Sequence, residues 1–328
     1  MWEIRNETPF PAERLTIVDK HGQRHWVVVV KGTFDIAQNG STSIAEAQCA
    51  PQLLPEYRGP MGQSSLLYEQ DLIATKPYTD VYLNATAHAP EGRSCSELIV
   101  ELGMPWGTKR LRIRGDSFWQ GDIVGGSRPT PFGAMPIVYE RAYGGYQADG
   151  SNPHNHRIHT DNPIGTGIAP LRAGALLPNI EYLDRPTSTT AGFGAICSFW
   201  TPRLNFQGTY DDEWVTHQKP LLPRDFDPRS LQCAPLDQQA SPHLLGGERF
   251  HTLNMNPRLP SLGFSLPHHT FELTTFAGPH THRHTATIQT VIIEPDHPRV
   301  IVVWHSALAC HEDIDQIDET LITEVDRD

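Results

Sequence analysis

The chain has 328 residues and a formal net charge of −12, with 38 acidic against 26 basic residues. A negative charge of this size disfavours nucleic acid and anionic membranes as partners. A hydrophobic fraction of 38% with 20% charged residues indicates a folded globular protein, and the abundance of glycine (26) and proline (28) favours short strands joined by shaped loops over long helices.

Two β-hairpins are expected within residues 12–120. In residues 14–36, two apolar runs flank the turn sequence DKHGQ, and in residues 96–119 GMPWG separates two alternating runs. The basic residues of KRLRIRG alternate with Leu111 and Ile113. This is the period of a strand, so the segment is not interpreted as a nucleic-acid-binding patch.

The central segment, about residues 121–267, has a different composition. It is rich in glycine, proline, asparagine and aromatic residues, a density of rings that flexible linkers lack. We interpret it as a long loop-rich region that packs on the β scaffold and presents shaped surface. A short helix is expected at residues 236–248, with the glycines as its stop signal.

A third hairpin is expected at residues 285–306, where EPDHP joins two strongly β-forming runs. The acidic end of the chain fits a helix through Ile314, Ile317 and Leu321, while ETLITEV fits a strand, and the pattern leaves both open. The expected fold class is therefore mainly β. Hairpins at about 12–120 and 270–306 would form a sandwich or barrel-like sheet in a single domain over residues 1–328.

Cysteine usage and the start of the chain predict a cytoplasmic protein. The five cysteines are scattered, odd in number and without C-x-x-C spacing, so neither a disulfide framework nor a zinc knuckle is expected. The first residues lack a signal-peptide pattern, and no apolar run approaches the ~20 residues of a membrane span.

Two histidine clusters are candidates for a metal site. His280, His282 and His284 recur at the period of a strand and could face one cation. Against this, no H-E-x-x-H motif or cysteine pair accompanies them, and histidines at a sheet edge also discourage edge-to-edge pairing, which is the favoured interpretation. The second cluster, in the loop sequence NPHNHRIHTD, is a weaker candidate and comprises His154, His156 and His159 with Asp161.

Carboxylates gather in the segment GTYDDEWVTHQKPLLPRDFDPRS and could in principle supply a general acid and base. Their positions beside proline and at the start of turns suit a capping role better. The chain has no G-x-S-x-G, P-loop or dinucleotide fingerprint, and neither a catalytic residue nor a cofactor is predicted. The carboxylates concerned are Asp211, Asp212, Glu213, Asp225 and Asp227.

An ordered series of short motifs runs from Asn6 to about Trp304: NETPF, YEQDLIATKPYTDVYLNATAHAP, RGDSFW, PFGAMPIVYERAYGG, NPIGTG, LPNIE, AGFGAICSFWTPR, GTYDDEW, LLPRDFD, APLDQQ and LLGGE. In this order the series resembles the type VI secretion system accessory, or effector-adaptor, family, which was long catalogued only as a domain of unknown function.

The resemblance implies a cytoplasmic, non-catalytic protein that holds a toxic effector, often one with a PAAR-like tip domain, and promotes its loading onto the VgrG spike. The family supplies no established binding residues. On physical grounds alone, because Trp, Tyr and Arg are enriched in binding hot spots, the nominated contacts are Arg141, Tyr143, Tyr146, Trp200, Arg203 and Trp214. Two alternatives stay open: a metal-dependent hydrolase that uses a histidine cluster, and a structural component of the spike or baseplate.

Overall fold

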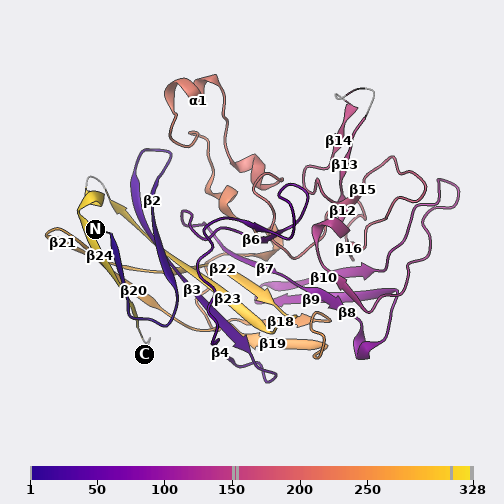
Figure 1. Cartoon of the computed structure of the whole chain (residues 1–328), viewed down its shortest axis with the longest axis horizontal. Coiled ribbons are helices and arrows are strands. Elements are labelled where there is room, and N and C mark those ends of the chain that lie inside the picture. The colour runs from indigo at the N-terminus through magenta and orange to yellow at the C-terminus, as the bar shows by residue number, and fades with distance from the viewer. Residues whose placement is uncertain (1, 150–151, 153–154, 311–312, 326–328) are drawn as a thin grey trace.

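The structure is mainly β, as the sequence predicts. The computed structural model describes residues 2–149, 152, 155–310 and 313–325 (Figure 1). Within these ranges there is one α-helix, α1 (Asp212–His217), and the other helical segments are short 3₁₀ turns. No helix in the part of the chain described is long and apolar enough to cross a membrane.

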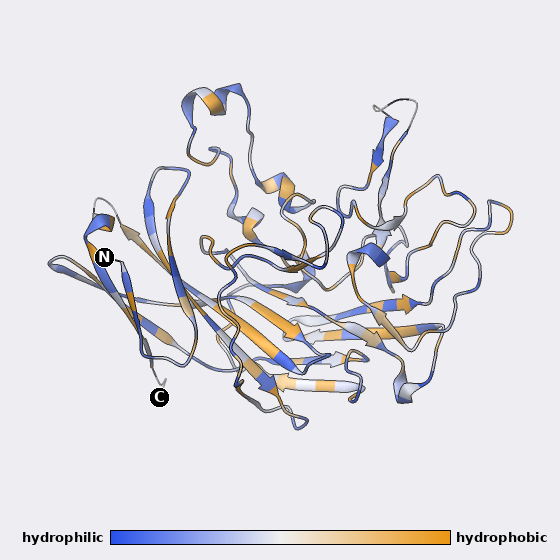
Figure 2. Ribbon diagram, in the orientation of Figure 1, coloured by the Kyte–Doolittle hydropathy of each residue, from blue (hydrophilic) through white to orange (hydrophobic). Residues whose placement is uncertain are grey.

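The largest sheet has seven strands. Its order is β17 (Gln239–Ala240), β7 (Thr79–Leu83), β22 (Thr287–Glu294), β23 (Arg299–Cys310), β3 (Arg24–Ile36) and β2 (Ala12–Val18), with β4 (Thr42–Ile44) paired to β3. Figure 2 shows hydrophobic residues concentrated on β22 and β23. Consecutive residues of β3, β22 and β23 are buried, so both faces of this sheet are covered, and such strands have continuous rather than alternating apolar sequences.

A four-stranded sheet packs against one face of the large sheet. Its order is β1 (Glu3–Asn6), β24 (Ile317–Glu324), β20 (Phe271–Ala277) and β21 (His280–Thr285). The Trp26 indole of β3 donates a 3.0 Å hydrogen bond to the Thr320 hydroxyl of β24. The rings of Phe271 and Trp304 meet edge to face with centroids 5.1 Å apart. The two sheets therefore pack face to face, as in a sandwich.

The third sheet has five strands and lies on the right-hand side of Figure 1. Its order is β16 (Ile180–Tyr182), β10 (Gly107–Arg114), β9 (Glu97–Met104), β18 (Arg249–Leu253) and β19 (Ser261–Ser265). Its inner face buries apolar side chains such as Val100 and Leu111 in the cluster that also contains the cores of the other two sheets. One continuous apolar cluster thus joins the three sheets.

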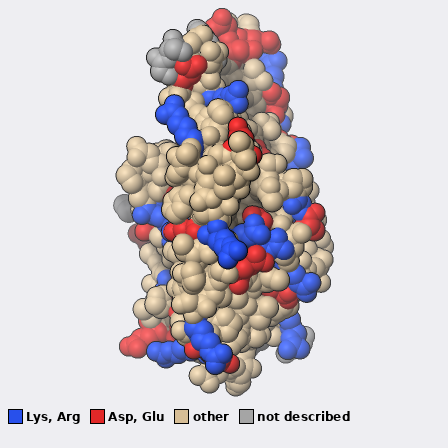
Figure 3. Space-filling model, turned by 90° about the vertical axis from the view of Figure 1, so that its right-hand side faces the viewer, with Lys and Arg blue, Asp and Glu red and all other residues tan. Residues whose placement is uncertain are grey.

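The outer face of the five-stranded sheet carries the three arginines of KRLRIRG. Each arginine of β10 is paired with a glutamate of a neighbouring strand, in the pairs Arg110–Glu101 (2.6 Å), Arg112–Glu97 (3.0 Å) and Arg114–Glu181 (3.2 Å). Figure 3 shows this side of the molecule, where Lys and Arg lie beside Asp and Glu. The interpretation of this segment as a strand face is confirmed, and its positive charge is neutralised locally.

Short ribbons and turns connect the sheets. The two-stranded ribbons pair β5 (Glu56–Tyr57) with β6 (Leu66–Tyr68), β8 (Thr86–His88) with β11 (Ala134–Pro136), β12 (Tyr143–Gly144) with β15 (Thr166–Gly167), and β13 (Tyr146–Gln147) with β14 (Arg157–Ile158). The 3₁₀ turns are η1 (Pro90–Gly92), η2 (Tyr139–Arg141), η4 (Arg203–Phe206), η5 (Pro228–Leu231), η6 (Leu236–Gln238) and η7 (Asp313–Gln316).

All three predicted hairpins are confirmed: β2–β3, β9–β10 and β22–β23. The helix expected at residues 236–248 is wrong. The Gln238 side chain is buried and donates to the carbonyls of Val81 and Phe193, which ends the 3₁₀ turn and places Gln239–Ala240 beside β7 as strand β17. The C-terminal segment, left open between helix and strand, forms β24.

The central segment is not only loops, because it supplies β16, β18 and β19 to the five-stranded sheet. Residues 249–265 form an antiparallel hairpin whose buried positions alternate along both strands. That period of two is present in RFHTL and SLGFS, so the sequence contained the signal for this hairpin.

A short segment, residues 69–80, fastens the loops of the central segment to the sheets through buried charges. Asp80 is fully buried and accepts four hydrogen bonds from nitrogen donors: 2.7 Å from Lys76 Nζ, 2.8 Å from the Gln232 side chain, 2.8 Å from the Cys233 amide and 3.1 Å from the Ala234 amide. Lys76 in turn donates to the Thr290 hydroxyl of β22 at 2.8 Å. This carboxylate therefore joins strand β7, strand β22 and the loop at 232–234.

Two further buried ion pairs involve the same segment. Asp71 pairs with Lys31 of β3 at 2.7 Å, and both side chains are almost fully buried. Glu69 pairs with the buried Arg203 of η4. Because an unpaired buried charge is costly, each of these contacts constrains where the distant segment can lie.

We predict that replacing Asp80 with Ala lowers the free energy of unfolding by about 3–5 kcal/mol, because Lys76 remains buried without its counter-charge. Urea denaturation followed by tryptophan fluorescence measures this change. The control is Asp227→Ala, which removes a half-buried cap of η5 and costs only about 1 kcal/mol. Equal losses for the two variants would contradict the role assigned to Asp80.

Candidate functional site

Two of the nominated contact residues are part of the core. Trp200 has no exposed surface and packs edge to face against Tyr139, with ring centroids 5.6 Å apart. Arg203 is 5% exposed and, besides its ion pair with Glu69, donates to the carbonyls of Ser230 (2.9 Å) and Ile196 (2.6 Å). Their interpretation as surface contacts is wrong, because Trp200 is packed in the core and Arg203 ties η4 to segment 69–80.

Arg141 and Tyr143 are half-buried and connect neighbouring loops. The Arg141 guanidinium donates to Asp116 at 2.8 Å and to Asn179 at 3.1 Å. The ring of Tyr143 meets His159 edge to face. Gly144 has a φ of +154°, and a Cβ there would lie 2.2 Å from the Asn162 carbonyl oxygen, so the glycine pair of AYGGY permits a close backbone approach.

Tyr146 lies on the β13–β14 hairpin and is exposed. It stands opposite Ile158 across the ribbon, and the two side chains are 51% and 53% exposed. The Tyr146 hydroxyl contacts the His156 ring nitrogen. Figure 1 shows this hairpin extending away from the sheets. An exposed tyrosine and isoleucine side by side on a polar ribbon are typical of a contact surface.

Trp214 lies on α1, in an extension that we call the α1 loop (residues 208–226). Asp211 caps the helix by accepting from the Trp214 amide at 2.9 Å, and Asp225 closes the loop by accepting from the amide and hydroxyl of Thr209. The Trp214 ring is half-buried against Tyr210, with centroids 4.8 Å apart, while Tyr210 and Val215 are 53% and 54% exposed. The loop thus has a fixed shape with exposed apolar side chains.

The carboxylates of this region act as caps. Hydrogen bonds from Thr209 lower the pKa of Asp225, and the hydrogen bond from Arg229 lowers the pKa of Asp227. A general acid needs a raised pKa, so these two residues are poor candidates for that role. Asp212 and Glu213 occupy the first turn of α1, where negative charge favours the helix.

The base of the α1 loop is fastened to the turn between β2 and β3. Lys20 Nζ donates to the carbonyls of Arg224 (3.1 Å) and Phe226 (2.9 Å), and the Gln218 side chain donates to the Lys20 carbonyl at 2.7 Å. The α1 loop and the β13–β14 hairpin extend from the same side of the sheets (Figure 1). We call these two extensions the projecting face.

Leu204 of η4 and Leu236 of η6 are both exposed. A hollow of about 400 Å³ is lined by Leu236, Pro202, Thr190 and Asp161, among others. Figure 2 shows α1 and the β13–β14 hairpin as mostly hydrophilic ribbons. The exposed apolar side chains of the two extensions are therefore isolated on polar supports.

Sequence reasoning missed a second hollow, of about 490 Å³, at the β9–β10 turn. Lys109 lies buried at its edge, with Nζ 2.9 Å from Asp237 and 5.3 Å from the centre of the Tyr182 ring. Arg185 stacks on the same ring at 4.0 Å. Burial lowers the pKa of Lys109 to about 8, and Asp237 opposes that shift. The sequence contained a signal for the burial of Lys109, because this residue shares the inward-facing positions of the strand with Leu111 and Ile113.

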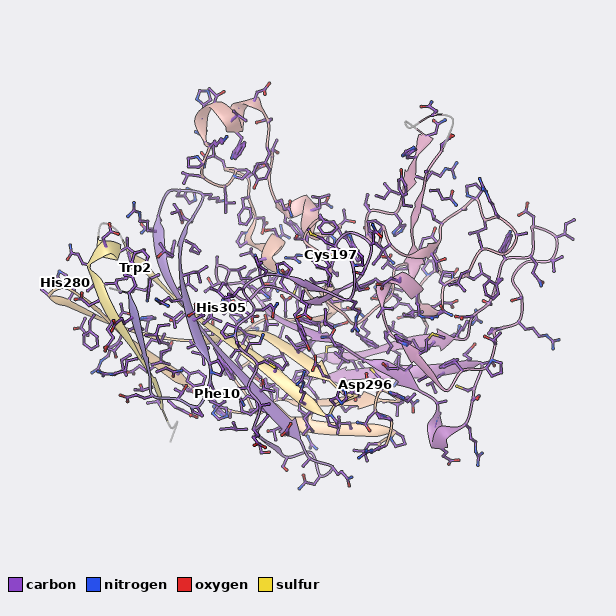
Figure 4. All side chains as sticks on the ribbon, viewed as in Figure 1. Trp2, Phe10, Cys197, His280, Asp296 and His305 are labelled. Carbon is purple, nitrogen blue, oxygen red and sulfur yellow. The ribbon has the colours of Figure 1, made fainter. Side chains whose placement is uncertain are left out.

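The three histidines of β21 do not converge on one point in the part of the chain described. β21 is the edge strand of the four-stranded sheet, as the favoured interpretation expects, and it pairs with β20. Both ring nitrogens of His284 are engaged, one with the Ser306 hydroxyl at 2.5 Å and one with the Thr275 hydroxyl at 2.9 Å. His280 and His282 are exposed, and Figure 4 shows His280 far from the interior position of His305.

The second histidine cluster is no better placed. His156 contacts Tyr146, His159 packs on Tyr143, and Asp161 accepts from Thr201, while His154 lies outside the described residues. Over residues 2–149, 152, 155–310 and 313–325, no three His, Cys, Asp or Glu side chains lie close enough together to hold a metal ion.

The fold is β-rich, and two loop-built extensions project from one side of its sheets. Residues 21–305 match the family described as an uncharacterized protein conserved in bacteria (DUF2169), and the chain belongs to that family. Neither a curated protein nor a solved structure matches the chain.

We predict a specific acid sensitivity from His284. Burial lowers its pKa to about 4, with a smaller contribution from His282. Between about pH 6.5 and pH 4 the unfolded chain therefore binds a proton that the native protein does not, and the free energy of unfolding falls as the pH falls. Between pH 7 and pH 4.5 the wild type should lose roughly 2–3 kcal/mol more than His284→Gln.

Chemical denaturation at the two pH values measures this difference. His280→Gln is the matched control, because His280 is exposed on the same strand. It should lose as much stability as the wild type. An unchanged pH dependence in His284→Gln would show that the buried ring does not cause the effect.

Proposed function

We propose that the protein is a type VI secretion system adaptor that binds a cognate effector, often one with a PAAR-like domain, and promotes its loading onto the VgrG spike. It would act in the cytoplasm and without catalysis of its own. The ordered motif series supports this proposal, because it extends over nearly the whole chain and resembles the adaptor family in order as well as content. The family match adds that such chains are bacterial.

The observation that carries the proposal is the projecting face. Tyr146 and Ile158 on one extension and Tyr210 and Val215 on the other are each about half exposed. The α1 loop is held in shape by Asp211 and Asp225 and is tied to the sheet by Lys20. A preorganised surface loses little conformational entropy on binding, so such contacts contribute efficiently to affinity.

The motifs of the resemblance support the proposal in a second way. Glu69, Lys76 and Asp80 of YEQDLIATKPYTD, and Arg203 of SFWTPR, are buried and hold the loops in place. GTYDDEW forms the start of the α1 loop, and AYGGY leads into the β13–β14 hairpin. The series therefore contains both the residues that fix the scaffold and the residues that shape the projecting face.

The negative charge of the α1 loop favours a positively charged effector segment. Asp211, Asp212 and Glu213 lie together at the start of α1 and are exposed. A basic segment of the effector would be attracted to this end of the loop, and the attraction would weaken as salt screens it.

The proposal predicts that the protein co-purifies with the product of the adjacent effector gene. Deletion of the adaptor gene should abolish secretion of that effector and leave secretion of VgrG intact, because an adaptor is needed for loading and not for building the spike. Loss of VgrG secretion as well, with the protein present in sheared spike material, would instead identify a structural component. Unchanged effector secretion and no co-purification would refute the proposal.

The projecting face predicts a mutational pattern. Tyr210→Ala and Tyr146→Ala should each weaken effector binding by about 1–2 kcal/mol, because exposed tyrosines supply contact area at low entropy cost. Calorimetric titration with the purified effector measures the loss. The control is Ile99→Ala, an exposed apolar position on β9, which should bind like the wild type. Equal losses at all three positions would contradict the assignment of the face.

A further inference from the structure

Strand β2 lies at one edge of the seven-stranded sheet. Hydrogen bonds at both ends of the strand show which of its residues bond to β3. The Lys31 amide donates to the Pro11 carbonyl at 3.0 Å, and the Asp19 amide donates to the Gln23 carbonyl at 2.9 Å. In an antiparallel pair, hydrogen-bonded residues recur every second position. The alternate residues Arg14, Thr16 and Val18 therefore direct their backbone N–H and C=O groups away from β3.

These outward groups are unpaired along the edge. No backbone hydrogen bond from Arg14, Thr16 or Val18 to another segment occurs among the described residues. The Thr16 hydroxyl is buried and has no partner within the same residues. An incoming strand can form backbone hydrogen bonds with such a row of outward N–H and C=O groups at alternate positions.

The other long edges of the sheets are less suited to receive a strand. β21, the edge of the four-stranded sheet, carries His280, His282 and Arg283, and polar or charged side chains discourage pairing. The outer side of β19 is crowded, since a Cβ on Gly40 would lie 2.6 Å from the Gly263 carbonyl oxygen. β2 is seven residues long, and its two charged side chains, Glu13 and Arg14, pair with each other at 3.5 Å.

The side chains of β2 add apolar contact to the open edge. Leu15 and Ile17 are half-buried and pack on the fully buried Val27, Val29 and Val303, which form a small second apolar cluster on that face. Val18, at the end of the strand, is exposed. A neighbouring strand with apolar residues at alternate positions would extend this cluster, as cross-strand pairs do within a sheet.

From these features we propose that an extended segment of the effector adds to the edge of β2 as a further strand. This proposal rests on the adaptor function above and names how the effector is held. The edge fixes the chemistry of the occupant: an extended main chain supplies donors and acceptors at the required alternate spacing, and apolar side chains at every second position face Leu15 and Ile17.

The added strand would continue the contact made by the projecting face. The far end of β2 leads into the turn whose Lys20 holds the base of the α1 loop. An effector segment along β2 therefore ends beside the α1 loop, and one partner can engage both surfaces.

Thr16→Pro tests the proposal in the full-length protein with the purified effector. Proline removes one outward N–H and breaks no hydrogen bond to β3, a position where edge strands tolerate proline. We expect binding weakened roughly tenfold or more, since a hydrogen bond is lost and the ring obstructs the incoming strand. Thr16→Val is the matched control: it keeps the N–H, removes the unpartnered hydroxyl and should bind like the wild type. Equal affinity of the two variants would overturn the strand addition.

Amide hydrogen exchange of the wild-type complex gives a readout that does not depend on folding of a variant. Binding should protect the outward amides of residues 14, 16 and 18 by roughly tenfold or more, as new backbone hydrogen bonds do. Tight binding with no such protection would refute strand addition and leave the adaptor function standing, whereas no binding by the wild type would refute the adaptor function itself. A wild-type dimer that Thr16→Pro converts to monomer would assign the edge to a second copy and overturn the proposal.

Discussion

The structure depends on one buried carboxylate, that of Asp80, and on the short segment that carries it. Asp80 accepts from Lys76 and from groups at 232–234, so a single side chain joins two strands of the large sheet to a loop more than 150 residues away in sequence. Taking these charges out of water is expensive, and the cost is offset only when every partner is in place. The sheets and the loops are therefore not independent: the loops have one arrangement in which the buried charges are satisfied.

This constraint explains how a chain with so little regular structure in its middle third can present a defined surface. Arg203 ties η4 to segment 69–80, and Lys20 ties the α1 loop to the β2–β3 turn. Exposed tyrosines at the two extensions are consequently held on fixed supports. The proposed adaptor function would need such preorganisation more than a deep pocket, because a preorganised surface loses little entropy on binding.

The hairpins were predictable because their periods are local: alternating or continuous apolar runs around turn sequences predict β2–β3, β9–β10 and β22–β23. The helix predicted at 236–248 does not form, because the buried Gln238 side chain bonds to distant carbonyls and this overrides the local helix signals. The candidate contact residues were harder to predict. Trp214 and Tyr146 lie on the two extensions, and their role as contacts stays a prediction, whereas Trp200 and Arg203 are buried by contacts distant in sequence, which no local pattern reveals. The open edge of β2 depends on strand order, and that too is set by long-range packing.

The most direct test of the proposed adaptor function is a structure of the protein bound to the proposed effector. The account predicts that the effector contacts Tyr146, Tyr210 and Val215 on the projecting face, with buried segment 69–80 unchanged from the free protein. An effector seated instead on the arginine–glutamate face of the five-stranded sheet, with the α1 loop and the β13–β14 hairpin still exposed to solvent, would contradict it.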